Sequence, residues 1–471
     1  MPLNNFFILM KQELIISVLL FILLFIKVGS KEWKNEQTML LINLLLLISF
    51  IFGFIGNMQG ILFNGMFVTN DRIVLEKNIL NLAVLIISMQ SYSWLKNHKH
   101  VPEFYILLFS SLLGMFFMIS SGNLLMFYLG LELSTIPLAA LSNFDLEKRA
   151  SSEAAMKMIM SSAFSSGILL FGISMVYGST GTLSLTDLPQ HLDGSALQLF
   201  AFILLFTGFA FKMSAVPFHL WTADVYEGSP VPVTSYLSVI SKGAIIFVFV
   251  SVLYTTFKEL AETWYHVLYL TAVLTMIVGN LFAIRQNSLK RFLAFSSIAQ
   301  VGFILIGISG SSQMGMAAVI YFVLIYVFSN LGAFGVVALV SALSGKENVD
   351  DYKGFYKTNP MLSWVLTISL FSLAGIPPTA GFFGKLFLLT AGAGKGNYLL
   401  ITIAALNMIV SLYYYLKVVK AIFMDKNDQP IENLKTDTFP KIALLICVLG
   451  IIMIGFVSEI YNYIYNLSFG L

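Results

Sequence analysis

Four ionisable side chains lie in the middle of long apolar stretches: Glu132, Lys212, Lys242 and Lys385. Lys242 is the eleventh residue of the apolar run 232–255, and at about 1.5 Å per residue it would lie near the middle of a membrane-spanning helix. Each such group costs about 2.5–3.5 kcal/mol to insert. Structural roles for all four would therefore cost roughly 10–14 kcal/mol. We expect them to carry protons, the alternative being structural ion pairs or bonds to carbonyl groups.

Two of these lysines accompany prolines inside long apolar runs. Lys212 precedes Pro217 by five residues in the run 196–222, and Lys385 follows Pro377 and Pro378 in a second run. Proline removes a backbone donor and leaves carbonyl groups that need water or a side-chain partner. Broken helices at matching places in two halves of a transporter mark inverted repeats and an ion path.

The elements that would position these residues are membrane helices. Of 471 residues, 58% are hydrophobic and 11% charged, whereas soluble domains carry about 25% charged residues. Runs long enough to span a bilayer lie at 12–27, 38–56, 73–95, 103–121, 123–142, 153–177, 196–222, 232–255, 265–284, 290–309, 314–343, 360–393, 398–422 and 439–462. We predict an all-α polytopic membrane protein with about fourteen transmembrane helices, two inverted five-helix repeats, and discontinuous helices 7 and 12.

This count divides the chain into four parts. The predicted domains are residues 1–102 (helices 1–3), 103–255 (first repeat, helices 4–8), 256–423 (second repeat, helices 9–13) and 424–471 (a loop and helix 14). The first run has no small-residue cleavage site after it, so it is expected to be a retained helix and not a signal peptide. The Gly- and Asn-containing region 57–72 is expected to be a loop.

The distribution of Lys and Arg predicts the orientation. If the N-terminus faces outward, the inward loops hold most of the basic residues: Lys31, Lys34, Lys96, Lys99, Lys148, Arg149, Arg285, Lys290, Arg291, Lys346, Lys353, Lys357 and Lys426. The outward loops hold little beyond Arg72, Lys258 and Lys395. The positive-inside rule then places both termini outside. We expect a multi-pass protein of the bacterial cytoplasmic (inner) membrane.

Composition and motifs exclude several other functions. The net charge of +3 is too small to indicate a nucleic-acid partner. The single cysteine, Cys447, excludes an intrachain disulfide, a Cys-based zinc site and an iron–sulfur cluster held by this chain alone. No Gly-x-Gly-x-x-Gly follows a strand, so no nucleotide cofactor site is expected. We expect neither a cofactor nor a metal in this chain.

Several stretches resemble the antiporter-like subunits of the proton-translocating NADH:quinone oxidoreductase (respiratory complex I). The most characteristic is 211–234, in which Asp-Val-Tyr-Glu-Gly (224–228) is similar to the subunit N type in particular. Glu-Ala-Ala-Met-Lys (153–157), Lys-Arg-Phe-Leu-Ala-Phe-Ser-Ser-Ile-Ala-Gln (290–300), Gly-Ile-Pro-Pro-Thr-Ala-Gly-Phe-Phe-Gly-Lys (375–385) and Leu-Tyr-Tyr-Tyr-Leu-Lys (412–417) also match. The resemblance is strong from about residue 105 to 422.

The resemblance implies a proton path across the middle of the membrane. Glu132 would be the fifth-helix glutamate paired with Lys212, Lys242 the central lysine, and Lys385 the residue leading outward. Lys157 matches a family lysine that could also be an interfacial residue, and His219 could either carry protons or satisfy the broken backbone.

At Gln300 some relatives carry His, which argues against a titrating role here, and Asp224 and Glu227 are interpreted as loop-capping residues. The resemblance also implies that FMN, iron–sulfur clusters and quinone belong to partner subunits, both membrane and peripheral, and that the chain acts within the enzyme as a translocase subunit.

Two alternatives remain open. One is a subunit of a multisubunit Mrp-type cation/proton antiporter, and the other is a structural membrane scaffold in which the buried charges merely pair.

Overall fold

The computed structural model describes residues 3–29, 33–56 and 58–468, so Lys31 of the orientation argument lies outside the described residues. The protein is a helical bundle. Its elements are α1 (Leu3–Leu9), α2 (Lys11–Val28), α3 (Asn35–Phe52), β1 (Gly60–Leu62), β2 (Phe67–Thr69), α4 (Asp71–Gln90), α5 (Tyr92–Leu95), α6 (Val101–Ile119), α7 (Leu124–Ser142), α8 (Arg149–Thr180), η1 (Leu188–His191), α9 (Ala196–Met213), α10 (Leu220–Gly228), α11 (Val231–Tyr236), η2 (Leu237–Ser241), α12 (Lys242–Thr255), η3 (Lys258–Leu260), α13 (Ala261–Ile284), α14 (Leu289–Ser309), α15 (Gln313–Ser344), η4 (Val349–Tyr352), α16 (Phe355–Thr358), α17 (Pro360–Ala374), α18 (Ala380–Ala393), α19 (Tyr398–Phe423), α20 (Thr438–Phe456) and α21 (Ser458–Leu467).

Every predicted apolar run coincides with one to three helical elements. Within the described residues, twelve helices are long and apolar enough to cross a membrane, and α17 and α18 are shorter apolar helices. The fold class is therefore confirmed, while the number of fourteen crossings stays a prediction.

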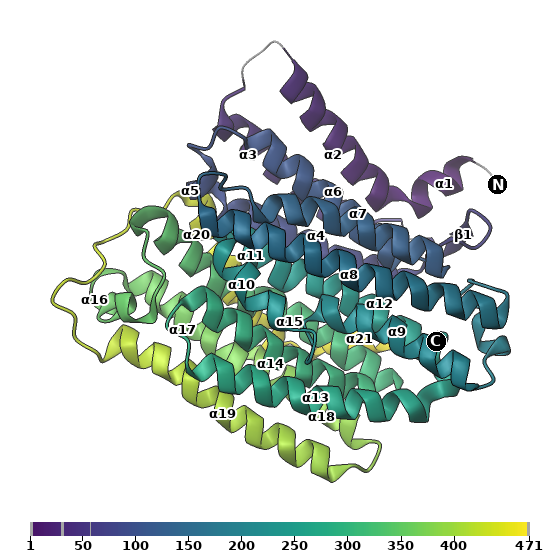
Figure 1. Cartoon of the computed structure of the whole chain (residues 1–471). Coiled ribbons are helices and arrows are strands. Elements are labelled where there is room, and N and C mark those ends of the chain that lie inside the picture. Colours follow the sequence, from purple (N-terminus) through teal and green to yellow (C-terminus); the bar gives the residue numbers. More distant parts are fainter. Residues whose placement is uncertain (1–2, 30–32, 57, 469–471) are drawn as a thin grey trace.

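The helices lie side by side and run across the view in Figure 1. One end of the bundle carries the β1–β2 hairpin, together with α1 and α21, and is called the hairpin end (Figure 1). The opposite end carries α5 and α16 and the lysine-rich loops, and is called the basic end (Figure 1). The two chain ends thus approach the same side of the bundle.

The region 57–72, predicted to be a loop, contains a short antiparallel hairpin. β1 and β2 pair with Gly60 opposite Thr69, and Asn64 and Gly65 make the turn with positive φ angles. The backbone of Val68 donates to the carbonyl of Ser120 at 2.8 Å, so the hairpin is fixed against the end of α6. The mixture of apolar, Gly and Asn residues in this region did not predict that two strands would pair here.

The centre of the bundle consists of largely apolar helices that are buried on all sides. Every residue of α14 is buried except Arg291, and most of α4, α12 and α15 is buried as well. A helix surrounded by other helices shows no single apolar face. By contrast, α2, α3, α19 and α20 expose large apolar side chains, as expected for helices that face lipid or another membrane subunit.

Both predicted helix breaks are present. The first lies between α9 and α10, where Ser214 adopts the left-handed conformation with φ of 65°, and the second lies between α17 and α18, where Gly375 does so with φ of 85°. A third irregularity was not predicted: η2 is a π-helix that directly precedes Lys242 within one continuous span. Such π-helical turns occur frequently at functional sites.

Candidate functional site

Lys242 lies at the buried centre of the bundle and is 3% exposed. Its ammonium donates to Ser297 Oγ on α14 at 2.7 Å and lies 5.3 Å from the centre of the Tyr226 ring. Ser297 in turn donates to the carbonyl of Ala294. The central lysine of the first half therefore contacts a hydroxyl and an aromatic face, both of them neutral.

Lys385 is 1% exposed and contacts the second helix break. Its ammonium donates to the carbonyl oxygens of Leu373 at 2.8 Å and Ala374 at 3.2 Å, and it lies 4.8 Å from the centre of the Phe303 ring. Leu373 and Ala374 end α17, where carbonyl groups have no partner within the helix. The break thus supplies the acceptors that hold this lysine.

α14 connects the two lysines through three polar side chains on neighbouring turns. Ser297 accepts from Lys242, and Gln300 donates to the carbonyl of Leu373 at 2.9 Å and to the hydroxyl of Tyr415 at 3.1 Å. Tyr415 on α19 also hydrogen-bonds Ser296. Ser296, Ser297 and Tyr415 were not predicted as site residues, although all three lie in stretches that carry the family resemblance.

Lys212 ends α9 at the first break and donates to Thr135 Oγ1 on α7 at 2.5 Å. Glu132, one turn earlier on α7, is close enough to interact electrostatically with Lys212. Within the described chain the two side chains form no ion pair, and the buried Oε1 of Glu132 makes no hydrogen bond. The expected Glu132–Lys212 pair is thus an approach of opposite charges without direct contact.

His219 precedes α10 and is almost fully buried, and its Nδ1 has no hydrogen-bond partner among the described residues. The broken backbone nearby is satisfied instead by Trp221, whose indole N–H donates to the carbonyl of Phe211 at 3.1 Å, and by Thr275, which accepts from the N–H of Val216 at 3.0 Å. Neither residue was predicted.

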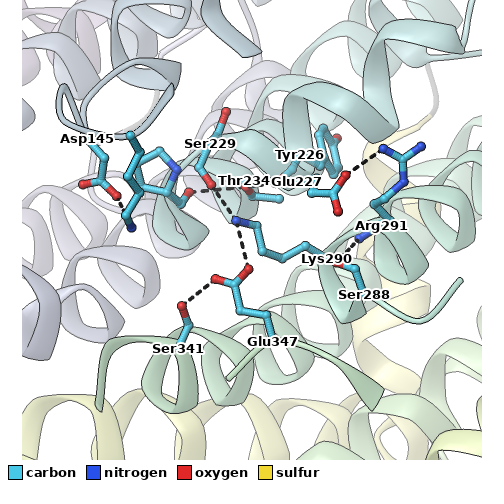
Figure 2. Close-up of polar contacts among 12 residues, drawn as sticks. Asp145, Tyr226, Glu227, Ser229, Thr234, Ser288, Lys290, Arg291, Ser341 and Glu347 are labelled. Carbon is cyan, nitrogen blue, oxygen red and sulfur yellow. Dashed lines mark hydrogen bonds and ion pairs between the residues drawn. The ribbon is translucent and has the colours of Figure 1, made fainter. Parts of the chain in front are cut away.

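Lys157 belongs to an ion-pair network at the basic end. Its ammonium lies 2.7 Å from both Glu153 and Asp224, and Asp224 also pairs with Arg291 at 2.8 Å. Arg291 reaches Glu227 at 2.7 Å (Figure 2). Asp224 and Glu227 therefore form ion pairs between helices, where the sequence had suggested loop capping.

A cavity of about 400 Å³ opens beside this network at the basic end. Lys290 lines it and is buried, and its ammonium donates to the carbonyl of Ser229 at 2.9 Å and lies 3.6 Å from Glu347 (Figure 2). Ser341 donates to the same carboxylate at 2.6 Å. Tyr226, whose ring lies against Lys242, stands directly before Glu227 of the cavity wall. Helix α10 therefore contributes to the cavity wall and, in the preceding residue, to the surroundings of the central lysine.

The acceptors around Lys242 and Lys385 have a chemical consequence. Within the described chain, neither ammonium has a carboxylate within 4.0 Å, whereas the buried Lys77 pairs directly with Glu13. A buried lysine paired with a carboxylate is held in its charged form. A lysine that contacts only neutral oxygens can release its proton without leaving a carboxylate unpaired.

The described residues offer no group of three or more His, Cys, Asp or Glu side chains that could hold a metal ion. Helices α7, α9, α12 and α18 instead carry buried or half-buried protonatable groups, and the hydrogen bonds that Lys212, Lys242 and Lys385 donate go to hydroxyl or carbonyl oxygens.

Comparison with known proteins identifies the family of the chain. Residues 121–411 match the family described as NADH:quinone oxidoreductase/Mrp antiporter, TM. NADH-quinone oxidoreductase subunit N of Phocaeicola vulgatus is 45% identical over 95% of this chain and 95% of its own length. The subunit of the same name from Azobacteroides pseudotrichonymphae is 43% identical over 100% of this chain and 99% of its own length.

Solved structures show the same fold. A chain of respiratory complex I from Thermus thermophilus with bound aureothin is 26% identical, with a TM-score of 0.79 over 95% of this chain and 98% of that one. A chain of the Mrp complex from Dietzia sp. superposes with a TM-score of 0.85 over 98% and 96%, but its 18% identity speaks only to the fold. On sequence and structure together, the chain belongs to the NADH-quinone oxidoreductase subunit N family.

Proposed function

We propose that this chain moves protons across the membrane through Lys212, Lys242 and Lys385, as a subunit of an NADH:quinone oxidoreductase. The observation that carries the proposal is the bridge on α14, by which we mean two residues one turn apart: Ser297, which bonds Lys242, and Gln300, which bonds the carbonyl that Lys385 also contacts. Structural ion pairs would have placed carboxylates beside Lys242 and Lys385, and of these two lysines Lys385 is the one that bonds carbonyl groups in the described chain. Neutral acceptors favour groups that gain and lose protons.

Proton access from the basic end would use the cavity beside Lys290. It is polar and far larger than the space that one water needs, about 10–15 Å³. The lysine-rich loops support an orientation with the basic end toward the cytoplasm and both termini outside, in a bacterial inner membrane.

Glu132 would act on Lys212 from a short distance. Because the two approach without a direct bond, a small movement of α7 or α9 would change how strongly the carboxylate favours the charged lysine. Lys212 would then accept a proton when the carboxylate is near and pass it toward Lys242 when it withdraws.

The two breaks support a repeated architecture with boundaries near residues 103, 256 and 424. Each half would contribute one broken helix and one central lysine, with α14 of the second half completing the contact of Lys242 from the first. The redox chemistry belongs to partner subunits, membrane and peripheral, which would carry FMN, iron–sulfur clusters and quinone. The relatives' shared name, NADH-quinone oxidoreductase subunit N, supports that assignment over an Mrp-type antiporter.

The test is NADH-driven proton uptake by inverted membrane vesicles that carry Lys242→Ala, with the quinone reductase rate and complex assembly recorded on the same sample. We expect fewer protons taken up per NADH oxidised in a fully assembled complex. Lys353→Ala is the control, because Lys353 lies at the basic end and pairs only with its neighbour Asp350 at 2.7 Å within the described chain. Unchanged uptake would rule out this path, and lost assembly would favour the scaffold alternative.

A further inference from the structure

A second group of buried charges lies at the hairpin end of α2 and α4, outside the part of the chain that matches the family description. It consists of Glu13 on α2 and Arg72, Glu76 and Lys77 on α4. Glu13, Glu76 and Lys77 are each 1% exposed. None of these side chains contacts the bridge on α14, so the proposed proton path does not explain them.

The charges in this cluster are unequally compensated. Lys77 hydrogen-bonds Glu13 directly, and the rings of Phe67 and Phe116 enclose its ammonium at 5.1 and 5.9 Å. Glu76, in contrast, forms no direct bond to either neighbouring cation within the described chain. Its Oε1 lies 3.8 Å from Arg72 Nε, which is too long for a hydrogen bond, and the ammonium of Lys77 is already bonded to Glu13. Lys77 and Glu13 thus neutralise each other by direct contact, and they are called the closed pair. Glu76 is a buried carboxyl group whose negative charge would be only weakly compensated by its neighbours.

Several buried polar atoms of the hairpin, α2, α4 and the residue after α6 make no hydrogen bond to the described protein. They are Glu13 Oε2, Thr69 Oγ1, Arg72 Nε, Glu76 Oε1, Asn78 Nδ2 and Ser120 Oγ. Buried polar groups are nearly always satisfied by protein or by ordered water. Two of these atoms, Glu76 Oε1 and Arg72 Nε, lie 3.8 Å apart without a hydrogen bond, so ordered water is expected to satisfy them. The carboxyl group of Glu76 becomes a hydrogen-bond donor if it binds a proton.

We propose that this cluster is a second buried ion-binding site of the chain, in which Glu76 binds a proton and ordered water fills the space between Glu76, Arg72 and Thr69. A protonated Glu76 supplies an O–H donor and removes an uncompensated negative charge from the interior. The closed Lys77–Glu13 pair holds α2 against α4 and keeps the site in place.

The hairpin provides the route to solvent. Glu76 lies five residues after Asp71, the first residue of α4, which is about 7.5 Å along the helix axis. The unbonded hydroxyls of Thr69 and Ser120 belong to the contact where β2 joins the end of α6. A proton on Glu76 therefore has only one turn and a half of helix to cross before the hairpin end.

Two variants separate proton binding from a structural ion pair. Glu76→Gln has the shape and the neutral charge of a protonated glutamic acid, so the thermal midpoint and assembly of the whole complex are expected to be unchanged. Glu13→Gln removes the negative partner of Lys77 and leaves a buried ammonium without a counter-charge, so the thermal midpoint of this variant is expected to fall. If Glu76→Gln lowers the midpoint as far as Glu13→Gln does, Glu76 is the ionised partner of Arg72 and the proposal is wrong.

The proton itself can be observed by infrared difference spectroscopy of the whole complex in membranes. The spectrum of the unaltered complex minus that of Glu76→Gln at neutral pH is expected to contain the carbonyl stretch of a protonated carboxylic acid, which shifts in D₂O. The absence of this band would overturn the proposal. Both measurements are independent of Lys242, so either result leaves the proton path of α14 to its own test.

Discussion

Gln300 and Lys385 donate hydrogen bonds to the same atom, the carbonyl oxygen of Leu373, at 2.9 and 2.8 Å. This oxygen is free to accept twice because α17 ends at the break, where its carbonyl groups lack helical partners. The amide of Gln300 therefore connects α14 to the lysine of the broken helix.

Replacing Gln300 by Leu removes this connection. The hydroxyl of Tyr415 would lose one partner, at a cost of about 1–3 kcal/mol of stability. We expect fewer protons per NADH in inverted vesicles with little change in assembly. Gln300→His keeps a donor at this position and is expected to retain proton uptake. Equal uptake in the Leu variant and the unaltered complex would exclude Gln300 from the path.

Ser297→Ala tests the other end of the bridge. Ser297 Oγ is the one hydrogen-bond acceptor that the described chain gives Lys242. Its loss leaves a buried ammonium unsatisfied, which costs about 1–3 kcal/mol or more, and should lower both the thermal midpoint and the proton uptake per NADH. Ser297→Thr keeps the hydroxyl and should restore both. A threonine variant as impaired as the alanine variant would mean that packing, and not the hydroxyl, matters here.

Lys157→Met is expected to keep the ratio of protons to NADH. The side chain of Lys157 is 38% exposed and already pairs with Glu153 and Asp224, so it acts as part of an interfacial ion-pair network. Exposed pairs contribute about 0.2–1 kcal/mol and are screened by salt. The loss of thermal stability should therefore be small and should shrink at high ionic strength. A fall in proton uptake would place Lys157 on the path.

Asp437 fixes the start of α20 to the end of α5 and makes stability depend on pH. Burial raises the pKa of Asp437, but hydrogen bonds from Lys96 and Ser93 outweigh it and hold the pKa below its usual value of 3.8. The folded state thus binds this proton less readily than the unfolded state. The contact stabilises fully above the unfolded pKa and is lost as pH falls through the lower folded value.

Asp437→Asn should therefore lower the thermal midpoint of the purified complex at pH 7, by an amount corresponding to about 0.5–1 kcal/mol. The difference from the unaltered protein should stay constant down to about pH 4 and shrink below it. A difference that persists undiminished at pH 3 would show that the carboxylate's charge is not what stabilises this contact.

The sequence was sufficient to predict that Lys242 and Lys385 lie within apolar helices, where both are buried, and to predict the two helix breaks. Hydropathy locates Lys242 within its span, and proline makes the interruptions near Lys212 and Lys385 predictable. The π-helix before Lys242 was not predictable, because a single wide turn barely alters the pattern of an apolar segment.

The partners of the lysines also lay beyond the sequence. Ser297 and Tyr415 are ordinary polar residues in apolar runs, and only packing shows that they meet Lys242 and Gln300. Glu13 and Lys77 lie near the ends of their runs, where charged residues normally reach water. The hairpin and α6 cover them, so a pair that resembles an interfacial one is buried.

The central claim is that Lys242 and Lys385 lie on one path joined by α14. The most direct measurement is the number of protons taken up per NADH oxidised by inverted vesicles carrying Lys242→Ala, Lys385→Ala or both, with assembly verified for each. On a single path, each variant lowers the ratio and the double variant lowers it no further than the more impaired single one. A double variant whose loss equals the sum of two partial losses would show two separate paths and contradict the account.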